Sequence, residues 1–212
     1  MGTRPETKEQ WRRWAVSGRR RRARQGETPM SDAVPSAAFD LALAPGLEGV
    51  LPGAGEWAAA YLAMADEPPT AGLTRLMAAR QIRLLAPAPG PSRTALAWAE
   101  VVAASCALPA ARPGSLPEPA GPRLGAEALA RCRLVLAPAL AVDLSGTRLG
   151  RGGGWYDRAL AQVAPGALVL GVCFADEVLA AGSLPREAHD RPVDGVLTPG
   201  GVVLFPVDGE GG

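Results

Sequence analysis

The sequence predicts an α/β fold in three layers, with a mainly parallel central sheet. Apolar runs of strand length, such as residues 134–140 and 167–174, alternate with segments of helical periodicity, such as residues 155–163. A glycine-rich stretch lies at one strand-to-helix junction. These observations indicate a Rossmann-like sandwich, in which ligands bind at the carboxyl ends of the strands.

Length and composition set the broad class of protein. The 212 residues suit one domain, which we expect at residues 1–207, with a disordered tail at 208–212. A net charge of +1 argues against a general nucleic-acid binder. No run of about 18 apolar residues suggests a membrane span, and the charged N-terminus lacks an apolar signal core. We expect a soluble, cytoplasmic monomer without membrane or nucleic-acid partners.

The cysteines do not indicate a disulfide framework or a zinc site. Cys106, Cys132 and Cys173 are odd in number, unevenly spaced and without a C-x-x-C pair. We expect buried free thiols.

The first element is expected to be one helix over residues 3–25. Thr3 and Glu6 have the spacing of a capping box. The basic run at residues 19–22 is interpreted as a solvated helix end, where cations also complement the helix dipole. A contact of this run with nucleic acid remains an alternative, for which salt-dependent binding would be the test.

Two cations of this helix are candidates for a specific role. Lys8 and Arg12 are four residues apart and therefore share a face. Lys8 is the sole lysine in a sequence rich in Ala, Gly, Pro and Arg. A lysine that persists in such a composition is a candidate for a task that arginine does not perform.

The middle of the chain is predicted to form short helices and strands, separated by residues that favour turns. Residues 87–122 are rich in Pro, Ala and Gly, and residues 112–125 are expected to form a crossing loop. We expect helices at 36–43 and 71–79, the second capped by Thr70, and strands at 57–64, 81–87 and 94–102. After the glycine-rich stretch we expect a strand at 167–174, a short helix at 176–181 and strands at 193–198 and 202–206.

The glycine-rich stretch has the composition of an anion-binding loop. Four glycines fall within residues 150–154, and Arg148 and Arg151 flank or interrupt them. Such a loop can direct several backbone N–H groups at one anion, and arginine forks suit phosphate oxygens. Asp157, in the first turn of the following helix, could hold a hard cation that bridges phosphates. Neither G-x-x-x-x-G-K-[ST] nor G-x-G-x-x-G fits, because lysine is absent here and Trp155 takes the last glycine's place.

This stretch closely resembles a known signature. The pattern Gly146-x-Arg148-Leu149-Gly150-x-Gly152-x-Gly154-x-Tyr156-Asp157-Arg158 is similar to that of the 5-formyltetrahydrofolate cyclo-ligases, also called 5,10-methenyltetrahydrofolate synthetases. The resemblance covers nearly the whole chain. It extends to Lys8-x-x-x-Arg12, to Glu67-x-x-Thr70, and to a His189-Asp190-x-x-x-Asp194 segment.

The resemblance implies a set of site residues. Catalytic roles fall on Lys8, Arg151 and Tyr156, and magnesium ligation on Asp157 and Asp190. Folate contacts fall on Leu62, Glu67, Arg151, Gly152, Gly153, Gly154 and Trp155, with Glu67 on the pterin. ATP contacts fall on Lys8, Arg12, Arg148, Leu149, Gly150, Arg151, Gly152, Gly153, Gly154, Trp155 and Tyr156.

The reaction that the resemblance implies is cyclisation of 5-formyltetrahydrofolate to 5,10-methenyltetrahydrofolate, with ATP and Mg²⁺, releasing ADP and phosphate. Such chemistry needs positioning and charge neutralisation more than a protein nucleophile. Trp155 stands where the family usually has Tyr, which indicates an altered pocket wall. A nucleotide- or phosphate-binding module without turnover remains the alternative. Either function requires the N-terminal helix to fold onto the glycine loop.

Overall fold

The computed structural model describes residues 4–25, 30–31, 34–35, 39–89, 96–102, 119, 121–187 and 190–206. The predicted cap at Thr3, the tail at 208–212 and most of the predicted crossing loop lie outside the described residues. Within them, no helix is long and apolar enough to cross a membrane.

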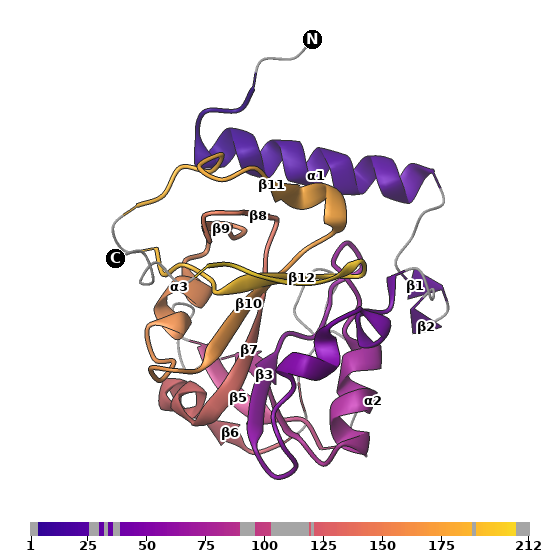
Figure 1. The fold of residues 1–212 in the computed structure, drawn as a ribbon, viewed down its shortest axis with the longest axis vertical. Helices are drawn as coiled ribbons and strands as arrows, with labels where there is room; N and C mark the ends of the chain where they lie inside the picture. Colours follow the sequence, from indigo (N-terminus) through magenta and orange to yellow (C-terminus); the bar gives the residue numbers. More distant parts are fainter. Residues whose placement is uncertain are drawn as a thin grey trace.

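A large, mostly parallel sheet forms the centre of the fold, as predicted (Figure 1). In the described part of the chain its eight strands lie in the order β13-β12-β10-β7-β3-β4-β5-β6, and the five from β12 to β4 are parallel. Antiparallel strands extend both edges. The bounds are β3 Trp57–Ala60, β4 Arg83–Pro89, β5 Leu96–Glu100, β6 Arg123–Leu124, β7 Cys132–Pro138, β10 Leu168–Val172, β12 Gly195–Thr198 and β13 Gly201–Leu204.

Helices cover both faces of this sheet, which gives the predicted three layers. Helix α2 (Ala71–Ala79) packs Leu73 and Met77 on one face, and α3 (Trp155–Leu160) packs Ala159 and Leu160 on the other. The central strands β3, β7, β10 and β12 are mostly buried on both sides, which explains why their sequences are continuous apolar runs rather than alternating ones. The 3-10 helices are η2 Leu41–Leu43, η3 Leu47–Val50, η5 Ala126–Arg131 and η6 Ala175–Glu177.

The order of the strands defines where a ligand site is expected. From β3 the chain proceeds outward through β4, β5 and β6, and from β7 it proceeds in the other direction through β10, β12 and β13. The connections therefore reverse between β3 and β7. In open α/β sheets, the crevice at the carboxyl ends of the strands beside such a switch point is the usual ligand site.

Several predicted elements differ in detail. The helix at 71–79 is confirmed in full, but the side chain of Thr70 does not cap it and instead accepts a hydrogen bond from the Ala63 N–H. The predicted strand at 57–64 ends at Ala60, and the chain leaves the sheet as a loop. At 176–181 the predicted helix is wrong: η6 is followed by a short strand, β11 (Val178–Leu179). Only the 3-10 turn η2 represents the helix predicted at 36–43, of which residues 36–38 are not described.

A second, small sheet lies between the large one and helix α1. It consists of β8 (Ala141–Asp143), β9 (Arg148–Leu149) and β11, in the order β11-β8-β9. A further pair, β1 (Met30–Ser31) with β2 (Val34–Pro35), is separate. Figure 1 shows α1 lying across the end of the molecule, above β8, β9 and β11.

Helix α1 spans Lys8–Arg24, five residues later in its start than predicted. The capping box is formed by Thr7 and Gln10 rather than by Thr3 and Glu6: Thr7 accepts from the Gln10 N–H, and the Gln10 side chain accepts from the Thr7 N–H. One apolar stripe, with Trp11 and Ala15 at helical spacing, packs on Leu140, Ala141, Leu149 and Leu184.

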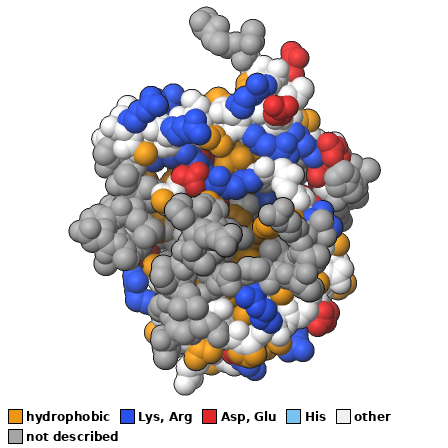
Figure 2. Space-filling model, turned by 180° about the vertical axis from the view of Figure 1, so that it is seen from behind, with side chains coloured by type: hydrophobic (Ala, Val, Ile, Leu, Met, Phe, Trp, Pro, Cys, Tyr) orange, Lys and Arg blue, Asp and Glu red, His pale blue; other side chains and the backbone are white. Residues whose placement is uncertain are grey.

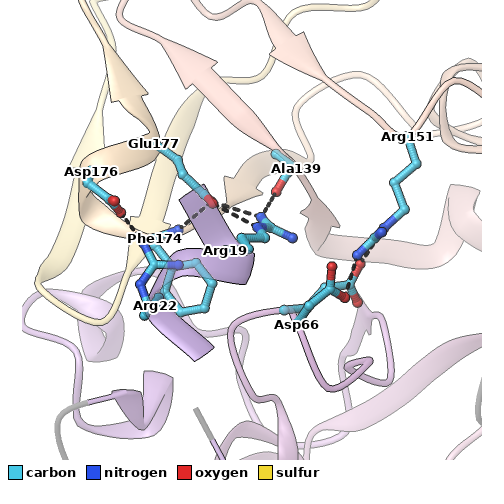
Figure 3. A network of polar contacts seen from close by, with 9 residues as sticks. Arg19, Arg22, Asp66, Ala139, Arg151, Phe174, Asp176 and Glu177 are labelled. Carbon is cyan, nitrogen blue, oxygen red and sulfur yellow. Dashed lines mark hydrogen bonds and ion pairs between the residues drawn. The ribbon is translucent and has the colours of Figure 1, made fainter. Parts of the chain in front are cut away.

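The next position of that stripe is Arg19, which is buried rather than solvated. Its side chain is 2% exposed; Nε and Nη2 donate to the two oxygens of Glu177 at 2.7 and 2.8 Å, and Nη2 also donates to the Ala139 carbonyl. One turn on, Arg22 pairs with Asp176 and its guanidinium lies 4.0 Å from the centre of the Phe174 ring. Figure 3 shows both arginines reaching from α1 to this segment. The solvated interpretation of the run at 19–22 is therefore wrong for Arg19 and Arg22.

We predict that Arg19→Ala lowers the free energy of unfolding by about 3–5 kcal/mol, because it leaves the Glu177 carboxylate buried without its partner. Urea denaturation measures the change. Arg20→Ala is the matched control, because the neighbouring arginine is exposed, and a change within about 0.5 kcal/mol is expected there. Equal effects of the two substitutions would contradict the structural role of Arg19.

Candidate active site at the switch point

The glycine loop follows β7, but not directly as predicted. The β8–β9 hairpin intervenes, and Asp143 organises its turn: one oxygen accepts from the Ser145 and Thr147 N–H groups, and the other from the Leu184 N–H. Sequence reasoning assigned no role to Asp143. Its position two residues before Ser145-Gly146 is a turn signal that could have revealed the hairpin.

The loop itself, residues 150–154, is mostly exposed and lies between β9 and α3. Gly152 and Gly154 have φ values of 95° and 64°, in the left-handed region that only glycine adopts readily. The following helix ends at Leu160 rather than at the predicted residue 163. With only six residues, α3 adds little dipole field, so any anion binding here depends on the loop amides and on neighbouring cations.

Helix α1 contacts this loop, as both of the functions expected from the sequence require. The Arg12 Nε donates to the Gly150 carbonyl at 3.0 Å. A Cβ at Gly152 would lie 3.2 Å from the Arg12 Cζ, so the loop backbone and the guanidinium are in close contact. These two segments, far apart in sequence, therefore form one surface.

Lys8 lies one turn before Arg12 on the same helix. Its ammonium pairs with Asp190 at 2.7 Å and Glu187 at 3.2 Å. Partial burial works against the charged ammonium, but the hydrogen bonds to the two carboxylates outweigh it and raise the pKa of Lys8. The structure thus brings together the predicted catalytic lysine and Asp190, one of the two predicted metal ligands.

Arg148 lies beneath the loop rather than on its surface. Its side chain is 3% exposed, donates to the Pro138 carbonyl at 3.0 Å and pairs with Asp157. A Cβ at Gly150 would approach the Arg148 Nη1 at 3.1 Å, so the guanidinium supports the loop from below. Within the protein, Arg148 therefore supports the loop and holds Asp157, and its predicted phosphate contact stays a prediction.

Arg151 points from the loop toward the segment after β3 (Figure 3). Its Nε donates to Glu67 at 3.1 Å, and its Nη2 to Asp66 at 2.7 Å. Glu67 is buried, and its other oxygen accepts from the Met64 N–H at 3.0 Å. Leu62 is half-buried in the same segment. The predicted folate contacts Glu67 and Arg151 thus meet, one after β3 and the other after β7, on either side of the switch point.

The two predicted aromatic walls differ in exposure. Trp155 is 40% exposed beside the loop. Tyr156 is half-buried overall, bridges both core clusters and lies edge-on to Trp98. Burial, followed by the nearby Glu67 charge, raises the pKa of the Tyr156 phenol, so this group is neutral at physiological pH.

The two predicted metal ligands are carboxylates, which suit Mg²⁺, but they do not form a complete metal site by themselves. Asp157 pairs with Arg148, and Asp190 with Lys8. Within the part of the chain that the structure describes, no group of three or more acidic, His or Cys side chains is gathered as for a metal. Mg²⁺ usually binds through one or two carboxylates and the phosphates of a nucleotide, so this donor set fits an ion that arrives with a nucleotide.

Arginines of α1 also form a basic surface. Arg12, Arg13, Arg20, Arg21 and Arg24 line a shallow groove with Val16 and Ser17. In Figure 2, Lys and Arg side chains gather along the edge of the molecule where α1 lies. Arg19 and Arg22 form ion pairs within the protein. Only Arg20 and Arg21 of the run at 19–22 are therefore exposed for contact with another molecule.

Comparison with known proteins gives the family. The 5-formyltetrahydrofolate cyclo-ligase family model matches residues 55–199. A 5-formyltetrahydrofolate cyclo-ligase of Mycolicibacterium smegmatis is 46% identical over 95 residues, which are 42% of this chain and 48% of the relative. A mitochondrial one of Arabidopsis thaliana is 37% identical over 78 residues, 33% of this chain and 28% of the relative. These matches thus span half or less of the curated relatives.

Solved structures agree over nearly the full length. The structure of Aquifex aeolicus 5,10-methenyltetrahydrofolate synthetase matches with a TM-score of 0.66 and 25% identity, over 96% of this chain and 95% of that one. The synthetase of Mycoplasma pneumoniae matches with a TM-score of 0.61 and 14% identity, over 92% and 99%, and supports the fold alone. The family match covers well over half of the sequence and includes the glycine loop and Glu67. The chain belongs to the 5-formyltetrahydrofolate cyclo-ligase family.

Proposed function

We propose that this protein is an ATP-dependent enzyme that cyclises 5-formyltetrahydrofolate to 5,10-methenyltetrahydrofolate, with release of ADP and phosphate. The observation that carries the proposal is the meeting of three segments at the switch point. Arg12 of α1 contacts the glycine loop at Gly150, and Arg151 of the same loop contacts Glu67 after β3. The loop can therefore serve a nucleotide on its α1 side and a folate on its Glu67 side.

The nucleotide half of the site consists of α1 and the loop. Lys8 and Arg12 supply positive charge on one helix face, and the amides of residues 150–154 supply neutral donors. Because Arg148 is engaged below the loop, Arg151 is the loop arginine best placed to reach a phosphate, by releasing its acidic partners. Trp155 borders the same surface.

The folate half is centred on Glu67. A pterin presents its 2-amino group and ring N–H as adjacent donors, which match the two oxygens of a carboxylate. Leu62 would pack against the ring, and the loop residues Gly152, Gly153 and Gly154 allow the substrate to approach the backbone closely. Arg151 lies between this half and the nucleotide half.

The proposed reaction has two chemical steps. The formyl oxygen attacks the γ-phosphorus of ATP, so that an O–P bond forms, the bond between the β- and γ-phosphates breaks and ADP leaves. The folate N10 then attacks the formyl carbon, loses its proton, and the phosphorylated oxygen departs as phosphate. Lys8, Arg12 and Arg151 would orient the transferring group and offset its charge, and the neutral Tyr156 phenol would wall the site against water.

Asp157 and Asp190 would hold Mg²⁺ together with the nucleotide phosphates. The ion would supply Lewis-acid neutralisation of the phosphate charge. Both carboxylates now have cationic partners, Arg148 and Lys8, from which they would be shared or released when nucleotide binds.

The direct experiment is to mix protein, 5-formyltetrahydrofolate, ATP and Mg²⁺, and to follow the absorbance of the methenyl product. Product growth that requires both ATP and Mg²⁺ is expected. ATP binding by calorimetry without any product would instead favour the alternative, a nucleotide-binding module without turnover.

For Lys8→Ala we predict a loss of kcat of about 10²–10³, that is about 2.7–4 kcal/mol of transition-state stabilisation, because the ammonium acts on the transferring group. The assay above measures it, with circular dichroism to verify the fold. Arg13→Ala on the exposed face of the same helix is the control and should stay within about twofold of wild type. A Lys8 variant with wild-type kcat would remove Lys8 from the mechanism.

For Glu67→Gln we predict that the KM for 5-formyltetrahydrofolate rises about tenfold or more, while the KM for ATP changes less than about twofold. The reason is the loss of a charged acceptor, worth about 1.5–3 kcal/mol, on the folate side only. Asp66→Asn is the control, because Asp66 shares Arg151 but is far more exposed. A similar rise in both variants, or in both KM values, would argue against a pterin contact at Glu67.

For Asp157→Asn we predict that turnover falls at least about 100-fold and that any residual activity needs more Mg²⁺ than wild type, because the amide is a poorer ligand for a hard cation. A magnesium titration of kcat measures this. Asp176→Asn, which loses an exposed carboxylate bound to Arg22, should retain the wild-type titration. Unchanged magnesium dependence in the Asp157 variant would refute its role as a ligand.

A further inference from the structure

Two buried hydrogen-bond donors at the main core cluster have no partner among the described residues. They are the indole Nε1 of Trp98 and the hydroxyl of Tyr156. The two rings are in edge-to-face contact, with centroids 6.3 Å apart and planes at 87°. Buried donors are nearly always satisfied in native proteins, so a neighbouring pair of unsatisfied ones indicates an absent ligand or water.

Strand register places Trp98 at the carboxyl end of the sheet. Trp98 lies on β5, opposite Pro87 of β4. Since Ala59 of β3 pairs with Leu85, position 87 on β4 extends beyond Ala60, where β3 ends. The indole is 1% exposed and therefore lies inside the molecule, level with the segment that leads from β3 to Glu67.

Tyr156 connects the indole to Glu67. Tyr156 packs against the core cluster that contains Tyr61, and Arg151 of the loop before Tyr156 donates to Glu67 at 3.1 Å. In keeping with this arrangement, the Glu67 charge contributes, after burial, to the raised pKa of both phenols. The Tyr61 hydroxyl donates to the Pro68 carbonyl at 2.8 Å and is satisfied. The Tyr156 hydroxyl has no such bond in the described structure. Of these two phenols, Tyr156 therefore offers the unused donor.

The other buried indole without a partner among the described residues belongs to a different cluster. Trp11 lies on the face of α1 that packs on the small sheet, edge-on to Trp14. Trp98 differs because it packs in the main core beside a second unsatisfied donor, the Tyr156 hydroxyl.

We propose that Trp98 is a substrate-positioning residue, whose indole N–H, together with the Tyr156 hydroxyl, binds the acceptor groups of the folate head. This inference rests on the proposed function. The pterin donates from its 2-amino group and ring N–H, for which Glu67 is the acceptor, and it accepts at its 4-oxo oxygen. A pocket with a carboxylate on one side and two neutral donors on the other complements both edges of the ring. It also disfavours heterocycles that lack the acceptor, because they would leave the donors buried and unpaired.

The test is Trp98→Phe, which keeps an aromatic ring and removes the N–H. Calorimetric titration with 5-formyltetrahydrofolate in the absence of ATP should show a Kd about five- to tenfold above wild type, and the KM for ATP should stay within about twofold. Trp57→Phe is the matched control: Trp57 packs against the same core cluster but lies at the start of β3, beside Cys132 and Arg83. It should bind folate like wild type.

A second measurement does not depend on the variant's stability. In wild-type protein with ¹⁵N-labelled tryptophan, 5-formyltetrahydrofolate should shift one buried indole N–H resonance, and an ATP analogue should not shift it. Wild-type folate affinity in Trp98→Phe, or equal loss in Trp57→Phe, would overturn the proposal, as would indole resonances that do not respond to folate. If the wild-type protein converts 5-formyltetrahydrofolate but neither Trp98 experiment gives the expected result, only this inference fails. If wild type neither binds nor converts the folate, the proposed function fails with it.

Discussion

The buried ion pair between Arg19 and Glu177 holds helix α1 across the carboxyl ends of the sheet. A helix with only a narrow apolar stripe gains little from packing, and α1 buries few of its side chains. The bidentate contact to Glu177, with the bond to the Ala139 carbonyl, fixes its C-terminal half to the segments that follow β7 and β10. Two turns earlier, Arg12 thereby meets Gly150, and Lys8 meets Asp190. The nucleotide half of the proposed site depends on this attachment.

Charge compensation is the second constraint on the site. Three of the cations around the loop have acidic partners: Lys8 has Asp190, Arg148 has Asp157, and Arg151 has Asp66 and Glu67. Unpaired buried charges are costly, so these pairs compensate one another's charges when no ligand is bound. A triphosphate with its magnesium carries the same two kinds of charge. In the proposed function, nucleotide binding would exchange these partners, phosphate for carboxylate on Lys8 and Arg151, and metal for guanidinium on Asp157.

The sequence predicted the fold better than it predicted the contacts among the candidate site residues. Continuous apolar runs identified β7 and β10 because strands buried on both faces show no alternation. Helix α2 was predicted in full because turn signals bound it closely. The β8–β9 hairpin was missed because its strands are too short to show a period, although Asp143 and Gly146 marked its turn. The prediction for Arg19 was wrong because a run of charged residues usually lies in solvent. Its spacing of four residues from Ala15, and of eight from Trp11, instead places it on the buried face of α1. Its partner, 158 residues away, has no signal in a single sequence.

Lys8 allows the most direct test of the account, because it is the sole lysine of the chain and its modification can be read without ambiguity. The measurement is the rate at which an amine-reactive reagent modifies Lys8, followed by mass spectrometry of its peptide, with and without a non-hydrolysable ATP analogue and Mg²⁺. If α1 and the glycine loop hold one triphosphate, the analogue slows the modification of Lys8 several-fold. An unchanged rate at a saturating concentration of analogue, as judged by calorimetry, would contradict the shared site.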